Sequence, residues 1–267
     1  MSTKAATKKP KAPIYSFSLD PGVANSLQVD RHGNLYLADT YSTWVFEYAQ
    51  GTNTPLKSFP TSEPPDQIAI RGKTLYVFQS ARSGGDVSVQ IYDKGSVTAT
   101  RSLSDGTMQY PDALAVDGAG NVFVAYSTSD LSSGVGEFVK GQMPMIPLTL
   151  NGVSLPLAMA IDPAGNLVID NANDDGTSSL QIYPPGQSKH SATIPGLPWL
   201  YQFSFTADGT ALYTGDSGTG REDQAFQKYE YPSGKQIYNR RIGDAFAGVS
   251  GVAASPSAEP GVWGTQD

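Results

Sequence analysis

Short apolar segments alternate with polar turns along most of this chain, and the same arrangement returns six times. In each copy an alternating apolar segment runs into a turn, usually with Gly, and a second apolar segment follows. Alternation with a period of two residues is typical of a half-buried β-strand, and Gly allows the positive φ that a tight hairpin needs. The copies start 41 to 49 residues apart and span 27–39, 68–78, 114–126, 159–171, 203–216 and 252–264. We therefore expect six related units made of strands.

Two further strands are predicted after most copies. The third strand is expected at 44–51, 88–95, 136–141, 179–186 and 226–234, and each ends in a Gly or Pro-Gly turn. The fourth and most polar strand is expected at 55–60, 99–104, 145–150, 190–195 and 236–243. A repeat of this length with four strands is typical of a β-propeller blade, which must stack on neighbours to bury its apolar faces. The fold class expected is an all-β, six-bladed β-propeller.

The two ends of the chain are expected to meet. Residues 14–25 align with the outer strand and loop that precede each other copy, so this N-terminal strand should complete the last blade and close the ring. The sixth copy has no clear third strand, so either that blade is short or the natural chain is longer. The expected organisation is a disordered basic tail over 1–13 and a single β-propeller domain over 14–267.

Charge narrows the classes of partner. The formal net charge is −7, and four of the 18 basic residues lie within the first eleven positions, which leaves 14 basic against 25 acidic residues in the rest. A body this acidic repels phosphate backbones, so no nucleic-acid partner is expected. No segment reaches 18 apolar residues, so no membrane span is expected either. We expect a monomer.

The absence of Cys excludes disulfides and thiolate metal sites. The first 13 residues lack the apolar core of a signal peptide, which favours the cytoplasm. The low charged fraction, 16%, also suits an exported protein whose leader has been removed, and both alternatives stay open.

A cluster of polar residues is predicted at one end of the central channel. Counting five residues back from the aligned Asp position of the first strand gives Asn25, Asp66, Asp112, Leu157, Tyr201 and Ser250. In a propeller these positions lie where the chain enters the innermost strands. Asn25, Asp66 and Asp112 belong to neighbouring blades and could share one divalent cation with oxygen ligands. The alternative is that Asn and Asp cap turns through their own side chains.

Two strings in the sequence resemble NHL repeats and the gluconolactonase/strictosidine-synthase class of six-bladed propellers: NLYLADTYSTWVFEYAQG (34–51), and LAVD with GNVFVAY (114–126). The resemblance covers about residues 14 to 264. No Gly-His and Trp-Asp pairs mark the repeats, which disfavours a WD-type propeller. The fold hosts hydrolases, lyases, oxidoreductases and binding scaffolds, so it does not define an activity.

The gluconolactonase-like family carries a divalent-metal site of Glu, Asn and Asp at this channel mouth, with one Asp in a Pro-Asp-Gly segment. The similar segment here is Tyr110-Pro111-Asp112-Ala113, so the resemblance carries over best to Asp112, as metal ligand and catalytic base. Pro65-Asp66 is a weaker match. This sequence departs from the family in having no Glu in the first copy and Ala113 in place of Gly. The cofactor implied is one Ca²⁺ or Zn²⁺ ion.

Aromatic residues are frequent in the loops expected on the same face. Tyr110, Tyr126, Trp199 and Tyr201 are the predicted ligand-binding residues, because rigid amphipathic rings suit sugar and peptide surfaces. The alternative for these rings is packing between blades. Trp44 lies inside a strand pattern and is expected in the core.

Other chemistry has little support in the sequence. The segment 170–176 resembles the start of a calcium loop, but Ile182 stands where the bidentate Glu should be, so a polar turn is expected. His32 and His190 are too far apart in the predicted ring for a Ser-His-Asp arrangement. The function predicted is a non-catalytic scaffold that recognises a small ligand, glycan or protein at the top of the channel. The alternative is a metal-dependent hydrolase of the lactonase type.

Overall fold

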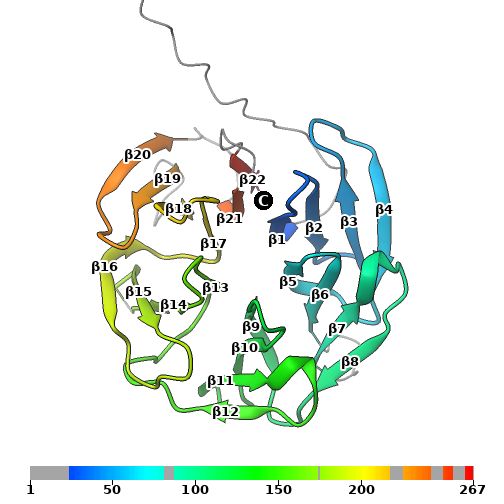
Figure 1. Ribbon diagram of the computed structural model, residues 1–267, viewed down its shortest axis with the longest axis horizontal. Coiled ribbons are helices and arrows are strands. Elements are labelled where there is room, and N and C mark those ends of the chain that lie inside the picture. Colours follow the sequence, from blue (N-terminus) through cyan, green and yellow to red (C-terminus); the bar gives the residue numbers. More distant parts are fainter. Residues whose placement is uncertain are drawn as a thin grey trace, which may run out of the picture.

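The computed structural model of the chain describes residues 24–80, 87–173, 175–216, 225–241, 249–254 and 262–266. Within these ranges the protein is an all-β ring of sheets around a central axis (Figure 1). The predicted basic tail, 1–13, and the predicted closing strand, 14–19, lie outside the described residues.

Five four-stranded antiparallel sheets form the blades, each ordered from the axis outward as its strands follow in sequence. Blade 1 contains β1 (Ala24–Val29), β2 (Leu35–Asp39), β3 (Trp44–Tyr48) and β4 (Pro55–Pro60). Blade 2 contains β5 (Pro65–Arg71), β6 (Thr74–Gln79), β7 (Ser88–Tyr92) and β8 (Arg101–Ser104). Blade 3 contains β9 (Tyr110–Val116), β10 (Val122–Ser127), β11 (Ser133–Phe138) and β12 (Ile146–Leu148).

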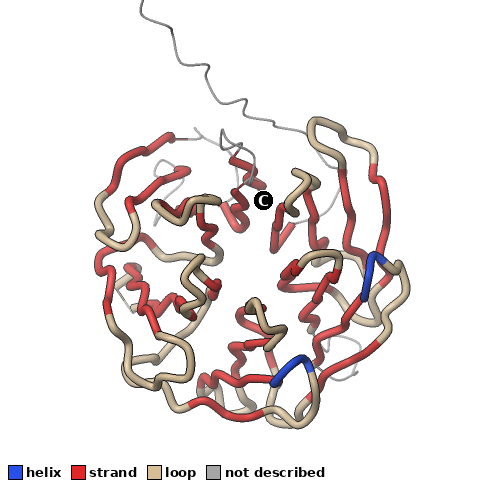
Figure 2. Tube along the Cα trace, viewed as in Figure 1, coloured by secondary structure: helices blue, strands red, loops and turns tan. Residues whose placement is uncertain are grey.

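Blades 4 and 5 repeat the same plan. Blade 4 contains β13 (Met159–Ile161), β14 (Leu167–Ala172), β15 (Thr177–Tyr183) and β16 (Ala192–Pro198). Blade 5 contains β17 (Phe203–Phe205), β18 (Ala211–Asp216), β19 (Ala225–Glu230) and β20 (Gln236–Arg241). Two single-turn 3-10 helices, η1 (Asp93–Gly95) and η2 (Val139–Gly141), follow the third strands of blades 2 and 3 (Figure 2).

The prediction of six blades is wrong in its count. The sixth copy forms a two-stranded sheet, β21 (Val249–Ala254) and β22 (Val262–Gln266), so the described residues contain five complete blades. This sheet lies between blade 5 and blade 1, with β21 in contact with β17 and β18 on one side and with β1 on the other. Among the described residues, no third or fourth strand pairs with β22, so this sheet lacks the outer half that the other blades have.

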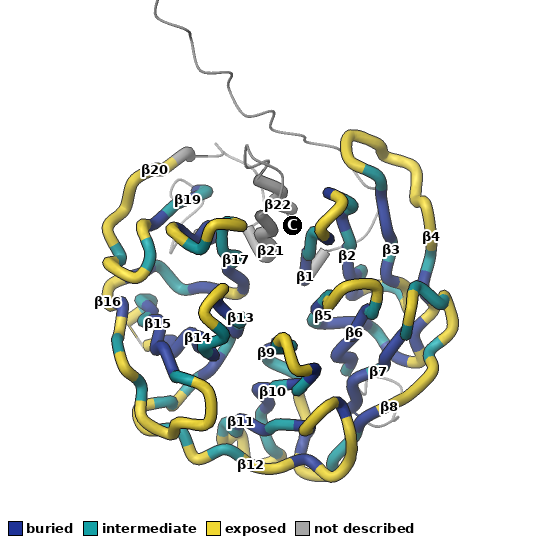
Figure 3. Tube along the Cα trace, viewed as in Figure 1, coloured by how far each residue is buried: buried dark blue, intermediate teal, exposed yellow. Residues whose placement is uncertain are grey.

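The core is divided among the interfaces between adjacent blades. Side chains of successive strand positions point to opposite faces of each sheet, so every blade contributes one apolar face to each neighbour. Separate buried clusters fill the four successive interfaces from blade 1 to blade 5. Figure 3 shows this as buried inner strands and exposed outer strands and turns. Each of these clusters combines residues of two adjacent blades, so a blade needs its neighbours to bury its apolar faces, as expected for a stacked repeat.

Local turn chemistry fixes the first hairpin of several blades. In blade 4, Asp162 Oδ1 accepts the backbone N–H groups of Ala164 and Asn166, at 2.9 and 2.8 Å, while Gly165 adopts φ +86°. Asp30 and Asp117 accept the corresponding bonds in blades 1 and 3. These turns and the turns between third and fourth strands define one face of the ring, here the turn face. The loops after the second strands, and the connections between blades, define the other, the loop face.

Candidate functional site

The three predicted metal ligands occupy equivalent positions in the innermost strands of blades 1, 2 and 3. Each stands at a β-bulge, where the register to the second strand skips one residue: Asn25 in β1, Asp66 in β5 and Asp112 in β9. Bulges re-aim a side chain and are frequent beside functional sites. The register thus brings the three positions to the same end of three neighbouring strands, on the loop face.

Both carboxylates are held by a serine at the end of the neighbouring strand. The Ser127 hydroxyl donates to Asp112 Oδ2 at 2.9 Å, and the Ser80 hydroxyl donates to Asp66 Oδ2. Asp66 is buried, and burial raises the pKa of Asp112, an effect that the Ser127 bond partly opposes. The Asp–Ser pair is therefore a repeated structural device as well as a candidate ligand pair.

These serines could have been found from spacing. Ser80 follows Asp66 by 14 residues and Ser127 follows Asp112 by 15, and in blade 1 Thr40 follows Asn25 by 15. A hydroxyl residue at the end of the second strand therefore accompanies each polar residue at the start of the first.

The donor set fits a divalent ion only in part. Ser127 bonds to Oδ2 of Asp112, and within the described residues no hydrogen bond reaches Oδ1, so one oxygen remains for a ligand. No group of three or more His, Cys, Asp or Glu side chains in the described part of the chain is arranged to hold a metal. The side chain of Asn25 lies outside the described residues.

Side-chain hydrogen bonds join the innermost strands of blades 5, 1 and 2. Gln202, directly before β17, spans to blade 1: its Oε1 accepts the Leu27 N–H at 3.1 Å, and its Nε2 donates to the Leu27 carbonyl at 2.6 Å. Ser26 joins blades 1 and 2, because its hydroxyl accepts the Ile68 N–H at 3.2 Å. These groups satisfy backbone atoms on the inner edges of β1 and β5 that the sheets leave unpaired.

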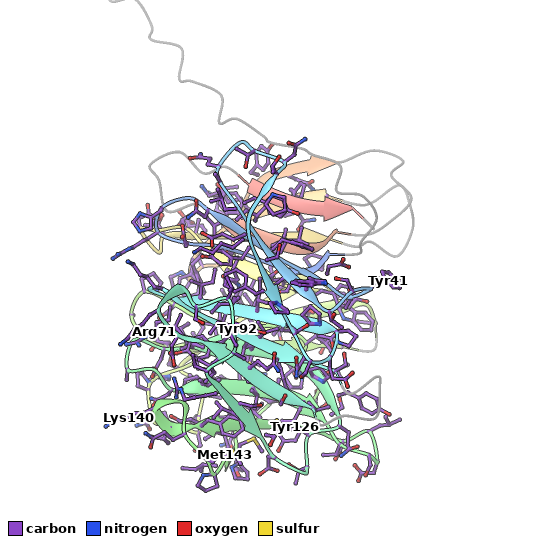
Figure 4. The ribbon with its side chains drawn as sticks, turned by 90° about the vertical axis from the view of Figure 1, so that its right-hand side faces the viewer. Tyr41, Arg71, Tyr92, Tyr126, Lys140 and Met143 are labelled. Atoms are coloured by element: carbon purple, nitrogen blue, oxygen red, sulfur yellow. The ribbon has the colours of Figure 1, made fainter. Side chains whose placement is uncertain are left out.

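The aromatic residues of the loop face divide into exposed and packed groups. Tyr110 and Tyr201 are 56% and 47% exposed, and Tyr41, in the loop after β2, is 74% exposed. Figure 4 shows Tyr41 projecting from this face, on the opposite side from Arg71 and Lys140 of the turn face.

The other predicted aromatics are less accessible. Tyr126 is 5% exposed and lies against Gly134, where an added Cβ would come within 2.6 Å of its ring. Trp199 is half-buried, and its Nε1 has no hydrogen-bond partner among the described residues. The expectation that Trp44 is a core residue is wrong: it begins β3 and is 39% exposed.

The structure assigns local roles to the polar segment 170–176. Asn171 Oδ1 accepts the N–H groups of Ser154 and Leu155, and Asp175 Oδ1 accepts that of Thr177. Asp170 lies within β14 rather than in the following loop and is fully buried. Asp174 is outside the described residues.

Comparison with known proteins shows the fold and no family. No known protein family and no curated protein sequence matches the chain. Among solved structures it is similar to hydrazine synthase from Kuenenia stuttgartiensis, with 15% identity, a TM-score of 0.63, and 91% of this chain and 73% of that chain covered. It is similar to a chain of a nidogen/laminin complex, with 15% identity, a TM-score of 0.64, and coverage of 91% and 83%. It is also similar to the Pan2 WD40 domain of Neurospora crassa, with 11% identity, a TM-score of 0.59, and coverage of 89% and 70%.

Fold and comparisons together define the class: this protein is a β-propeller built from sequence repeats. Identities of 11–15% show the fold alone, and the NHL and gluconolactonase resemblance is not confirmed. In the described residues, no helix has the length and apolar character needed to cross a membrane.

Proposed function

We propose that this β-propeller is a non-catalytic binding scaffold that recognises a small ligand, glycan or protein on its loop face, at the mouth of the channel. The observation that carries the proposal is the set of exposed tyrosines Tyr41, Tyr110 and Tyr201, which come from three different parts of the ring. Tyrosine supplies a large amphipathic contact area at low entropic cost, and this makes it frequent in recognition surfaces.

Rigid support of the innermost strands favours recognition by several blades together. Ser26 and Gln202 are buried, and their hydrogen bonds join the innermost strands of blades 5, 1 and 2. A ligand held between the tyrosines would contact several blades together. The acidic body favours ligands without multiple negative charges.

A second candidate is a metal-dependent hydrolase of the lactonase type, favoured by the common bulge position of Asn25, Asp66 and Asp112. A Ca²⁺ or Zn²⁺ ion bound there would supply a Lewis acid for a carbonyl group. In that case Asp66 and Asp112 would hold the ion, Asp112 through the oxygen that Ser127 leaves available, and Asp112, whose pKa burial raises, would be the base.

The proposal is tested with glycan and peptide arrays, followed by titration of any hit against variants. We expect Tyr110→Ala and Tyr201→Ala each to weaken the hit about tenfold, because removing an interface aromatic costs more than about 1 kcal/mol. Trp199→Ala tests whether the half-buried ring of Trp199 also contributes to binding of the hit. Tyr238→Ala is the matched control, since Tyr238 is 45% exposed on the outer strand β20. An unchanged hit in the first two variants, or equal loss in the control, contradicts the proposal.

Thermal-shift titration with Ca²⁺ and Zn²⁺ separates the two candidates. An ion that binds only the folded state must raise the Tm. A rise that Asp112→Asn abolishes would favour the hydrolase, and no rise with either ion would count against it.

A further inference from the structure

A pocket of about 410 Å³ lies between blades 3 and 4, on the turn face and away from the proposed binding surface. Phe123, Leu148, Ile161 and Tyr183 supply apolar wall, and Pro184 belongs to the turn at its rim. This volume falls within the range of pockets for small organic ligands. The described lining residues include two acids, Asp117 and Glu137, and no Lys, Arg or His.

Glu137 is the unusual group in this wall. It lies on β11 opposite Phe123 and is half-buried, yet it accepts no hydrogen bond and forms no ion pair within the described residues. Burial, and then the charge of Asp117, raise the pKa of Glu137. The carboxylate of Asp117, in contrast, accepts hydrogen bonds from its own turn, including one from Asn121 Nδ2 at 2.8 Å. The pocket therefore contains one carboxylate whose charge no neighbour compensates.

In blade 1 the glutamate at the same position has partners within the protein. Glu47 lies opposite Tyr36 on β2, as Glu137 lies opposite Phe123 on β10. Its carboxylate contacts Lys57 Nζ at 3.1 Å and accepts a hydrogen bond from Asn34 Nδ2 at 3.3 Å. After burial, the charge of Glu47 raises the pKa of Tyr36, which places that hydroxyl beside the carboxylate as well.

Blade 3 lacks these partners. The register pairs Glu47 with Lys57 but pairs Glu137 with Ile146. The hydroxyl of Tyr36 has no counterpart, since Phe123 stands there. The Asn121 amide bonds to Asp117 and is not bonded to Glu137. Blade 3 thus has Ile146 where blade 1 has Lys57, and Phe123 where blade 1 has Tyr36. The glutamate is present in both blades, but in blade 3 the cation and one hydrogen-bond donor are absent.

We propose that the pocket between blades 3 and 4 binds a small hydrophobic amine, with its ammonium group on Glu137 and its apolar body against Phe123, Ile161 and Leu148. The ligand's cation takes the place that Lys57 holds in blade 1. A charge-assisted hydrogen bond at a partly desolvated carboxylate is stronger than a neutral one, and the aromatic wall adds favourable contact with a cation. This site is independent of the loop-face function.

The test follows the methyl NMR signals of Leu148, Ile161 and Leu167 during titration with 4-phenylbutylamine and its neutral analogue 4-phenylbutanol at pH 7. We expect the amine to shift these signals and to bind about tenfold more tightly than the alcohol. Glu137→Gln should lower amine affinity to that of the alcohol. Ile146→Lys, which restores the blade 1 arrangement, should also weaken the amine and leave the alcohol little changed.

Asp130→Asn is the charge-matched control, because it removes one negative charge from the opposite face of the same blade and should leave amine binding unchanged. The methyl spectra report the folding of each variant directly. Equal affinity for amine and alcohol, shifts confined to other methyls, or no binding of either probe at millimolar concentration would overturn the proposal. Amine affinity that survives Glu137→Gln would overturn it too.

Discussion

Asp170 shows most clearly how one residue can depart from the pattern of its repeat. Ala38, Phe78 and Ala125 hold the same strand position in blades 1 to 3, whereas blade 4 places a carboxyl group there with 0% exposure. Neither carboxyl oxygen has a donor in hydrogen-bonding geometry among the described residues. Burial raises the pKa of Asp170 to about 8, with a smaller opposing effect of Ser178. At neutral pH the folded protein therefore holds this acid mainly in its neutral form.

A raised pKa in the folded state makes stability fall as pH rises. Between the unfolded pKa near 4 and the folded value of about 8, the folded state retains a proton that the unfolded chain has released. We expect the stability advantage of Asp170→Asn over the natural protein to grow by about 4 kcal/mol between pH 5 and pH 9, since the linkage is about 1.4 kcal/mol per pH unit until the folded pKa is passed. Urea unfolding at several pH values measures this difference.

Asp130→Asn is the control for that series, because neighbouring hydroxyls lower the pKa of Asp130 to about 2 and it stays ionised throughout. A difference that is flat with pH would contradict the assignment of a neutral, buried acid.

At the scale of elements, the turn of a first hairpin can also connect two blades. Asp162 binds its own turn and, through Oδ2, also accepts the Tyr231 hydroxyl of blade 5 at 2.7 Å. The Asp-x-x-Gly-Asn pattern thus closes a hairpin and joins two blades with one side chain. The sequence predicts the turn from the Gly and the Asx geometry, but the bond to Tyr231 depends on residues 69 positions apart and has no local signal.

Asp162→Ala is expected to destabilise the protein by about 2–4 kcal/mol, because it leaves the Asn166 amide and the Tyr231 hydroxyl without their acceptor. Asp208→Ala removes an exposed Asp from the first-hairpin turn of blade 5, where it accepts the Thr210 N–H within its own turn, and should cost clearly less. Thermal unfolding of the two variants makes the comparison. Equal losses of stability in the two variants would show that the hydrogen bond from Tyr231 to Asp162 contributes nothing to the stability of the protein.

At the scale of the whole molecule, the ring is joined by side chains between blade 5 and blade 1. Gln202 forms two bonds to the Leu27 backbone, whereas the side chain of Gln67, at the same strand position in blade 2, makes no hydrogen bond within the described residues. This asymmetry lies beside the short sheet β21–β22, where the repeat is weakest.

Gln202→Ala is therefore expected to cost about 2–3 kcal/mol and to speed hydrogen exchange at the Leu27 amide, since two buried backbone groups lose their partner. Gln67→Ala is the matched control and should change neither quantity appreciably. Unchanged exchange at Leu27 in the first variant would contradict this role for Gln202.

The repeat pattern predicted the class of fold, the strand order within each blade and the equivalence of Asn25, Asp66 and Asp112. It did not predict the number of complete blades, because two strands of the last copy read like the inner half of any other. Contacts such as Ser26 with Ile68, or the lost partners of Glu137, depend on register between distant strands. Single-strand patterns carry no information about them.

The pair Glu47 and Glu137 has a consequence for how such a molecule can change over generations. Each interface between blades has its own side chains. One interface can therefore carry an isoleucine where another carries a lysine, while the remaining interfaces keep the protein folded. In the amine-binding proposal, a carboxylate that one interface neutralises with its own lysine is available at another interface to an outside molecule.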